Sequence, residues 1–112
     1  MKAAKKPAKK LAPPKDLLAD LVLANKILYG LDVVDAFGHI SVRHPKDPNH
    51  YLMARHLPPG MVTAKDIVLF DMDSTPLTHS DKPQYSERFI HSEIYKLRPD
   101  VTSVVHCHAY SL

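Results

Sequence analysis

The apolar positions of this chain follow two periods, one typical of helices and one typical of strands. Over residues 17–28 apolar side chains recur at helical spacing, after Pro14, which suits a first helical turn, and before Gly30 as a stop. A second helical pattern covers 87–97, with Ser86 in front of it as an N-cap. The pattern therefore predicts one helix near the start of the chain and one near its end.

The middle of the chain alternates with the period of strands. Ile40 and Val42 alternate with polar neighbours, which predicts a short strand beginning near Gly38. Further strands are predicted at 51–54, at 67–70, at 75–77 as the second arm of a hairpin, and through Val104 and Val105. Helices and strands in this order predict an α/β or α+β fold with a largely antiparallel sheet.

Charge divides the 112 residues into a tail and one domain. Residues 1–15 hold six lysines and no acid, whereas the remainder carries nine Lys and Arg against twelve Asp and Glu. We predict a disordered basic tail over 1–14 and a folded domain over 15–112. Contact of the tail with nucleic acid or an acidic surface is the alternative, and nothing in the acidic domain suggests a nucleic-acid groove.

The chain contains no apolar run of the roughly 18 residues that a membrane span needs. The basic start leads into no apolar signal core, so a cytoplasmic location is the default expectation. Cys107 is the one cysteine, which excludes an internal disulfide, and we expect it to be a small buried apolar residue.

Two histidines near the end of the chain are candidate metal ligands. His106 and His108 flank Cys107 after two β-branched residues, and alternate residues of a strand share one face. Two imidazoles on one strand face form half of a metal site. The alternative is a pair of partly buried imidazoles on an edge strand, and the pair alone does not decide between them.

Glu87 is the candidate third group. It stands at the predicted start of the second helix, 19 residues before His106, and that helix and the last strand are expected to run antiparallel. The first helical turn can then lie near the far end of the strand, where a carboxylate could bind the metal or act as a base. An acid that stabilises only its own helix is the alternative.

Several motifs together resemble the class II aldolase/adducin family. The resemblance covers roughly residues 16–112, and the Glu-then-His-X-His spacing is its most specific part. Its segments are 23–25 (L-A-N), 37–43 (F-G-H-I-S-V-R), 86–91 (S-E-R-F-I-H), 94–95 (I-Y), 98–101 (R-P-D-V) and 104–108 (V-V-H-C-H). It implies α/β/α layers, a central antiparallel sheet flanked by helices.

The resemblance also implies a catalytic metal. In that family the histidines at 106 and 108 bind a divalent ion, usually Zn²⁺, with Mn²⁺ or Co²⁺ as alternatives. The acid at Glu87 is a further ligand that can leave the metal and act as general acid and base. A third histidine lies downstream, so this chain is expected to be an incomplete N-terminal portion with little activity alone. Homo-oligomers, often tetramers, are implied as well.

The substrate-binding positions depart from the sugar-phosphate members. Those aldolases hold phosphate with Gly-Asn, Thr-Gly and Ser-Ser pairs, and each pair keeps one member here. The corresponding candidates are Gly38, His39, Thr63, Tyr85 and Ser86. His39 and Tyr85 resemble the branch with decarboxylases of hydroxylated aromatic acids, where His39 would meet a carboxylate or phenolate and Tyr85 would hydrogen-bond or stack. A strand-start histidine bonded to a loop is the alternative for His39.

The resemblance thus implies a metal-dependent lyase that cleaves a C–C bond, by decarboxylation or retro-aldol cleavage, in a small hydroxy-carbonyl or hydroxylated aromatic acid. The alternatives are a sugar-phosphate aldolase or epimerase and a non-catalytic adducin-like assembly module. The expected partners are a small-molecule substrate and copies of the chain itself, without nucleic acid or membrane.

The remaining polar residues receive structural interpretations. His44, His50, His56 and His79 are predicted to be solvated in loops, and Arg43 to be an exposed charge. His91, one turn after Glu87, either orients that carboxylate or packs within the fold.

Overall fold

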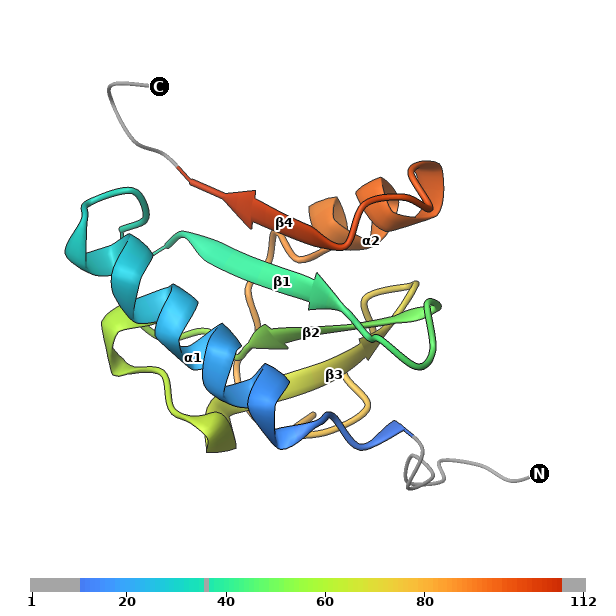
Figure 1. Ribbon diagram of the computed structural model, residues 1–112, viewed down its shortest axis with the longest axis horizontal. Coiled ribbons are helices and arrows are strands. Elements are labelled where there is room, and N and C mark those ends of the chain that lie inside the picture. The colour runs from blue at the N-terminus through green and yellow to red at the C-terminus, as the bar shows by residue number, and fades with distance from the viewer. Residues whose placement is uncertain (1–10, 36, 108–112) are drawn as a thin grey trace.

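A four-stranded antiparallel sheet organises the molecule (Figure 1). The computed structural model describes residues 11–35 and 37–107. The strand order is β3-β2-β1-β4. The elements are α1 (Lys15–Gly30), β1 (His39–Arg43), β2 (His50–Ala54), the 3-10 turns η2 (Pro59–Met61) and η3 (Ala64–Asp66), β3 (Ile67–Asp71), α2 (Phe89–Leu97) and β4 (Ser103–His106).

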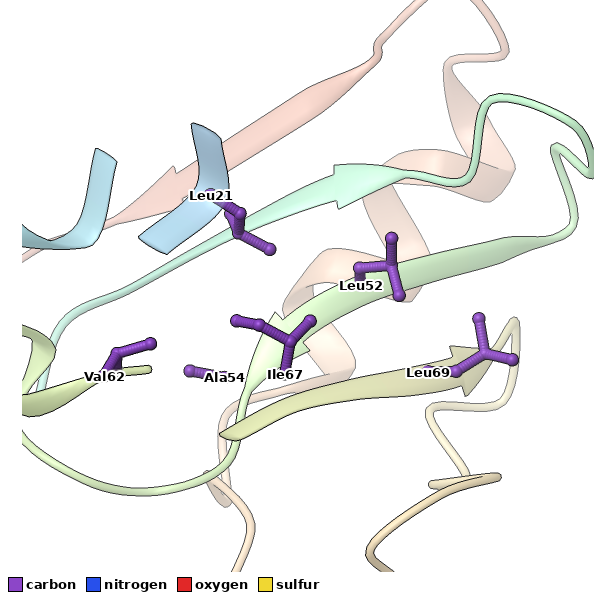
Figure 2. Packing of buried hydrophobic residues seen from close by; sticks show 6 residues of the cluster. All are labelled: Leu21, Leu52, Ala54, Val62, Ile67 and Leu69. Carbon is purple, nitrogen blue, oxygen red and sulfur yellow. The ribbon is translucent and has the colours of Figure 1, made fainter. Parts of the chain in front are cut away.

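One face of the sheet packs against α1. Alternate side chains of β2 and β3 point to this face because successive strand residues alternate sides. They meet Leu21 of α1 and Val62 in an aliphatic cluster (Figure 2). Its other buried members are Leu52, Ala54, Ile67 and Leu69.

The opposite face packs against α2 and is richer in aromatic rings. Its buried cluster consists of Tyr51, Met53, Val68, Phe70, Tyr85 and Tyr95. The rings of Tyr51 and Phe70 stack with centroids 5.0 Å apart, and Tyr95 reaches them from α2. Helices on both faces of an antiparallel sheet give the three layers that the sequence resemblance implies, so the predicted fold class is confirmed.

The pairing of β1 with β4 places two histidines side by side. His39 lies directly opposite His106, and Ser41 lies opposite Val104. Directly opposed residues of an antiparallel pair share a face. His39, Ser41 and His106 therefore lie on the face that α2 covers.

The second helix begins later than predicted. Ser86, Glu87 and Arg88 form a turn, and α2 starts at Phe89, with no side-chain capping bond at its N-terminus. Ser86 is therefore not the N-cap, and Glu87 is a turn residue. The predicted strand at 75–77 reduces to one bridge between Phe70 and Pro76.

Arg43 and His44 are structural residues, contrary to the prediction that they are solvated. Arg43 lies partly buried with its guanidinium 4.6 Å from the ring centroid of Tyr95. It donates hydrogen bonds to the carbonyls of Val101, Pro48, Tyr95 and Arg98, which ties β1 to the end of α2. His44 is buried, and its Nε2 donates to the carbonyl of Leu11 at 2.9 Å.

The other solvation predictions have mixed outcomes. His56 and His79 are exposed as expected, whereas His50 and Cys107 are partly exposed.

The first ten residues of the predicted tail lie outside the described residues, and Leu11 packs at the edge of the aliphatic cluster. Neither described helix has the length and apolar character to cross a membrane.

Candidate metal centre

Three side chains that are distant in sequence meet beside the end of β4. Glu87 Oε1 lies 3.0 Å from His106 Nε2 and 3.9 Å from His39 Nε2. The ligand atoms that these residues offer all lie within 4.8 Å of one another. His106 comes from β4, His39 from the neighbouring strand β1, and Glu87 from the turn before α2.

This arrangement fits a divalent metal. Two ligand atoms bound tetrahedrally to Zn²⁺ at about 2.0–2.1 Å lie about 3.3 Å apart. The 3.0 Å between Glu87 Oε1 and His106 Nε2 is close to that separation, whereas the 3.9 Å from Glu87 Oε1 to His39 Nε2 exceeds it. Imidazole nitrogen and carboxylate oxygen are also the donors that Zn²⁺ accepts in catalytic sites. Glu87 and His106 can therefore supply two ligands to such an ion, with His39 beside them.

The three side chains differ in exposure in a way that suits different roles. The side chain of His39 is 1% exposed, that of His106 22% and that of Glu87 47%. The two imidazoles are fixed on paired strands, whereas the Glu87 carboxylate extends from a turn into solvent. A proton-transfer group must reach both substrate and water, and Glu87 is the one of the three with that access.

A buried chain of hydrogen bonds lies behind His39. His39 Nδ1 lies 2.6 Å from His91 Nε2, and His91 Nδ1 lies 2.5 Å from Ser41 Oγ. Ser41 Oγ in turn lies 2.7 Å from the Tyr95 hydroxyl. Burial, together with the neighbouring rings of His39 and His106, lowers the pKa of His91 to about 3. Burial raises the pKa of Tyr95 to about 12, so both side chains are neutral near pH 7.

His91 thus supports the site through His39. Its ring nitrogens contact His39 and Ser41, and it is fully buried. The sequence offered two interpretations, a residue that orients Glu87 or a packing residue. The contacts show a third arrangement, in which His91 fixes the ring of His39.

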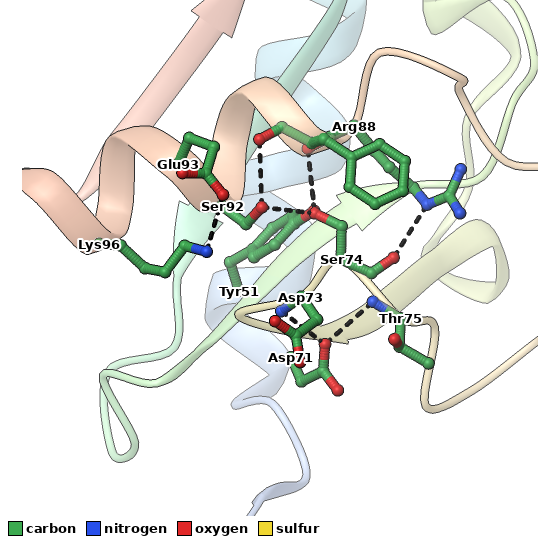
Figure 3. Close-up of polar contacts among 10 residues, drawn as sticks. Tyr51, Asp71, Asp73, Ser74, Thr75, Arg88, Ser92, Glu93 and Lys96 are labelled. Atoms are coloured by element: carbon green, nitrogen blue, oxygen red, sulfur yellow. Dashed lines mark hydrogen bonds and ion pairs between the residues drawn. The ribbon is translucent and has the colours of Figure 1, made fainter.

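The turn that carries Glu87 is anchored by its neighbour Arg88 (Figure 3). Arg88 Nε donates to the carbonyl of Ser74 at 2.9 Å, and its Nη1 donates to the carbonyl of Tyr85 at 3.1 Å. Ser74 is buried, adopts a positive φ of 60°, and its hydroxyl lies 2.6 Å from that of Tyr51. The position of Glu87 therefore depends on the loop after β3.

An aromatic wall, made of Phe37, His56 and Tyr85, borders His39. The rings of Tyr85 and His39 are 4.5 Å apart, those of Tyr85 and His56 4.7 Å, and those of His56 and Phe37 6.3 Å. The Tyr85 hydroxyl donates to the carbonyl of Leu57 at 2.7 Å, and burial raises its pKa. Tyr85 is buried, so its ring supports the rings of His39 and His56 from behind, and Phe37 and His56 are the exposed members of the wall.

The other predicted substrate residues have different positions. The Thr63 hydroxyl donates to Asp66 Oδ2 at 2.9 Å in a capping box at η3. Ser86 is exposed in the turn before Glu87. Gly38 is buried, and a Cβ built on it would lie 3.2 Å from the carbonyl oxygen of His106. The predicted ligand His108 lies outside the described residues.

Sequence reasoning missed Ser41, Tyr95, Phe37 and His56. Ser41 did carry a signal, because it is two residues after His39 and must share its strand face. Phe37 lies in the segment 37–43 of the family resemblance but received no role of its own, and His56 carried no signal, because two loops bring these residues together.

The sequence pattern of one protein family, described as the class II aldolase and adducin N-terminal domain, matches residues 19–112. The chain belongs to this family. A curated relative, the decarboxylase tropJ of Talaromyces stipitatus, is 46% identical over 85 residues, which are 74% of this chain and 32% of that protein. This class II aldolase-family chain is therefore similar in sequence to a protein described as a decarboxylase.

Solved structures of the family share its fold. The aldolase II superfamily protein of Pseudomonas syringae matches with a TM-score of 0.77 and 25% identity, over 94% of this chain and 42% of that one. L-fuculose 1-phosphate aldolase of Glaciozyma antarctica matches with a TM-score of 0.74 and 24% identity, over 89% and 46%. The chain thus spans about a third of the curated relative and less than half of these structures. At such identities the structural likeness establishes the fold alone.

Proposed function

We propose that this chain carries the metal-binding part of a class II aldolase-type lyase. The reaction is cleavage of a C–C bond, by decarboxylation or retro-aldol cleavage, in a small hydroxy-carbonyl or hydroxylated aromatic acid. The observation that carries the proposal is the approach of Glu87 Oε1 to within 3.0 Å of His106 Nε2. Two comparisons support the same reaction class. The chain belongs to a family whose members use a divalent metal, and one of its relatives is described as a decarboxylase.

Glu87 and His106 would hold the ion, together with the sequence-predicted ligand His108, and Zn²⁺ suits these donors best. When bound, the metal supplies a Lewis acid that stabilises negative charge on a substrate oxygen while the neighbouring C–C bond breaks. The exposed carboxylate of Glu87 then moves the proton between the substrate carbon and water. His39, on the buried side, faces the oxygen end of the substrate.

The aromatic wall favours a planar substrate. An aromatic acid can stack on the exposed rings of Phe37 and His56, with its carboxylate or phenolate directed toward His39. A sugar phosphate needs several polar groups around the phosphate instead. Of the corresponding positions, Thr63 already donates its hydroxyl to Asp66 and Tyr85 donates its hydroxyl to the carbonyl of Leu57. We therefore favour a hydroxylated aromatic acid over a sugar phosphate.

Metal binding tests the proposal most directly. Zn²⁺ titrated into purified metal-free protein and followed by calorimetry should bind, and Glu87→Gln and His106→Gln should each weaken the affinity at least about tenfold. Glu93→Gln, on the exposed side of α2, is the matched control and should leave it unchanged. Absence of Zn²⁺, Mn²⁺ and Co²⁺ binding would contradict the proposal and favour a non-catalytic, adducin-like module.

The substrate class requires a separate screen. Release of CO₂ from hydroxylated aromatic acids should be compared with cleavage of phosphorylated ketoses, using the metal-loaded protein. Turnover of phosphorylated ketoses alone would overturn the aromatic assignment and leave the metal site intact.

We also propose that the protein acts as a homo-oligomer, with a tetramer as the expected state. Exposed apolar side chains on both helices support this, namely Leu23 and Ile27 on α1 and Phe89, Ile90 and Leu97 on α2. Light scattering after size-exclusion chromatography should then give a mass of several chains, and a monomer at all concentrations would refute it.

A further inference from the structure

The direction of the buried hydrogen-bond chain behind His39 has a chemical consequence. The chain runs from Tyr95 through Ser41 and His91 to His39, and each of these residues is at most 2% exposed. Each neutral imidazole carries one proton, and each hydroxyl donates one. Fixing the donor of one bond therefore fixes the donors of the others.

Two directions are geometrically allowed. In the first, the Tyr95 hydroxyl donates to Ser41 Oγ, the Ser41 hydroxyl donates to His91 Nδ1, and His91 Nε2–H donates to His39 Nδ1. His39 then carries its own proton on Nε2, which faces Glu87. In the second, all donors reverse, and His39 presents a lone pair at Nε2.

The Tyr95 hydroxyl distinguishes the two directions. Among the residues that the structure describes, Ser41 Oγ is its one hydrogen-bond partner. In the reversed direction Tyr95 would accept from Ser41, and its own proton would be buried without an acceptor. Leaving a buried donor unsatisfied is costly, whereas the first direction uses every proton of the chain.

We propose that Tyr95, Ser41 and His91 hold His39 as the tautomer with its proton on Nε2, a neutral hydrogen-bond donor to an anionic substrate oxygen rather than a metal ligand. The low pKa of His91 agrees with a neutral ring at that position of the chain. His39 is then the binding residue for a carboxylate or phenolate oxygen, and Ser41, His91 and Tyr95 are positioning residues. This inference rests on the proposed function for the identity of the substrate, but the tautomer itself requires neither metal nor substrate.

Nitrogen-15 NMR of the metal-free protein tests the tautomer. Protonated and unprotonated ring nitrogens of histidine have well-separated shifts, and His39→Gln assigns the signals of that ring. We expect the Nε2-protonated form of His39 to exceed the Nδ1-protonated form at least about tenfold, given the cost of an unsatisfied hydroxyl. A predominant Nδ1-protonated form would overturn the proposal.

Two variants that each remove one hydroxyl test the direction of the chain. Ser41→Ala breaks the link to His91 and leaves His91 Nδ1 as an unpaired acceptor in the proposed direction and as an unpaired donor in the reverse one, so the excess of the Nε2-protonated tautomer of His39 should shrink without reversing. Tyr95→Phe makes the Ser41 hydroxyl the end of the chain, and because its one remaining acceptor is His91 Nδ1, the preference of His39 should persist. A Ser41→Ala spectrum identical to that of the unaltered protein would show that the chain does not set the tautomer. If Ser41→Ala does not fold, the spectrum of the unaltered protein decides.

Zinc binding separates this inference from the proposed function. His39→Gln should keep the Zn²⁺ affinity within about threefold, whereas His106→Gln should lower it at least about tenfold. An equal loss in both variants would make His39 a ligand and overturn the inference. Absence of Zn²⁺ binding in the unaltered protein would defeat the proposed function while the tautomer result stands.

Discussion

Gly38 occupies the tightest backbone position near the metal centre. It directly precedes His39, and a Cβ placed there would lie 2.6 Å from the Cβ of Val34 as well as close to the His106 carbonyl. Both neighbours are held, because Val34 is buried and His106 is paired with β1. Gly38 thus allows β1 to begin close enough to β4 for His39 and His106 to lie opposite each other.

Gly38→Ala is therefore expected to destabilise the protein by about 1–3 kcal/mol, the usual cost of overpacking. Urea unfolding measures this change. Gly30→Ala is the matched control, because nothing lies within 4 Å of its added methyl group, and it should be neutral or stabilising by about 0.5 kcal/mol. Equal unfolding free energies for both variants would contradict the close approach at Gly38.

At the scale of elements, the segment between β3 and α2 decides where Glu87 lies. Helical spacing predicted a helix from 87 to 97, and its end at Leu97 is confirmed. Its first two residues instead belong to the turn, where Arg88 binds the carbonyls of Ser74 and Tyr85. Local propensity could not reveal this, because Ser74 is 14 residues from Arg88. The turn places the Glu87 carboxylate beside β4.

Arg88→Met tests this positioning. It keeps the aliphatic stem but removes two hydrogen bonds, so we expect a loss of about 1–3 kcal/mol of stability. The Zn²⁺ affinity should also fall several-fold at a temperature where the variant is folded, because Glu87 is less well placed. Arg98→Met removes an exposed ion pair with Asp100 and should change neither quantity by much. Unchanged Zn²⁺ affinity in Arg88→Met would show that the turn holds Glu87 without this anchor.

At the scale of the whole molecule, the core of the described residues contains three buried phenols, those of Tyr51, Tyr85 and Tyr95, which makes its stability sensitive to alkali. Burial raises the pKa of both Tyr51 and Tyr95, and that of Tyr95 reaches about 12. An unfolded chain releases the tyrosine proton near pH 10. Between pH 10 and 12 the unfolded state therefore binds fewer protons than the folded state, and stability falls as pH rises.

The contribution of the buried tyrosines to the unfolding free energy should be constant below about pH 10 and should decrease above that pH. Tyr95 alone contributes about 2–3 kcal/mol to that decrease. Tyr95→Phe should make the decline shallower, and Tyr29→Phe, an exposed tyrosine on α1, should not. Urea unfolding at pH 8 and pH 11.5 measures the slopes, and equal slopes in all three proteins would disprove the contribution of Tyr95.

The sequence by itself determined the elements and the faces of the strands. Helical spacing in α1 and alternation at Ile40 and Val42 are local properties of the chain, so the two helices and the antiparallel sheet follow from them. The resemblance in the 86–108 segment also selected Glu87 and His106, which the structure brings within 3.0 Å. His108, chosen on the same basis, remains a sequence prediction.

Only the tertiary structure decided what surrounds these groups. His39 joins the centre because β1 pairs with β4 in one register, and Ser41, His91 and Tyr95 meet because α2 crosses that face. Arg43 and His44 are polar by type, and their burial depends on carbonyls from distant segments that become available only after folding. Hydrogen-bond partners that are more than 30 residues apart leave no periodic trace in a sequence, which is why the tautomer of His39 could be inferred from the fold alone.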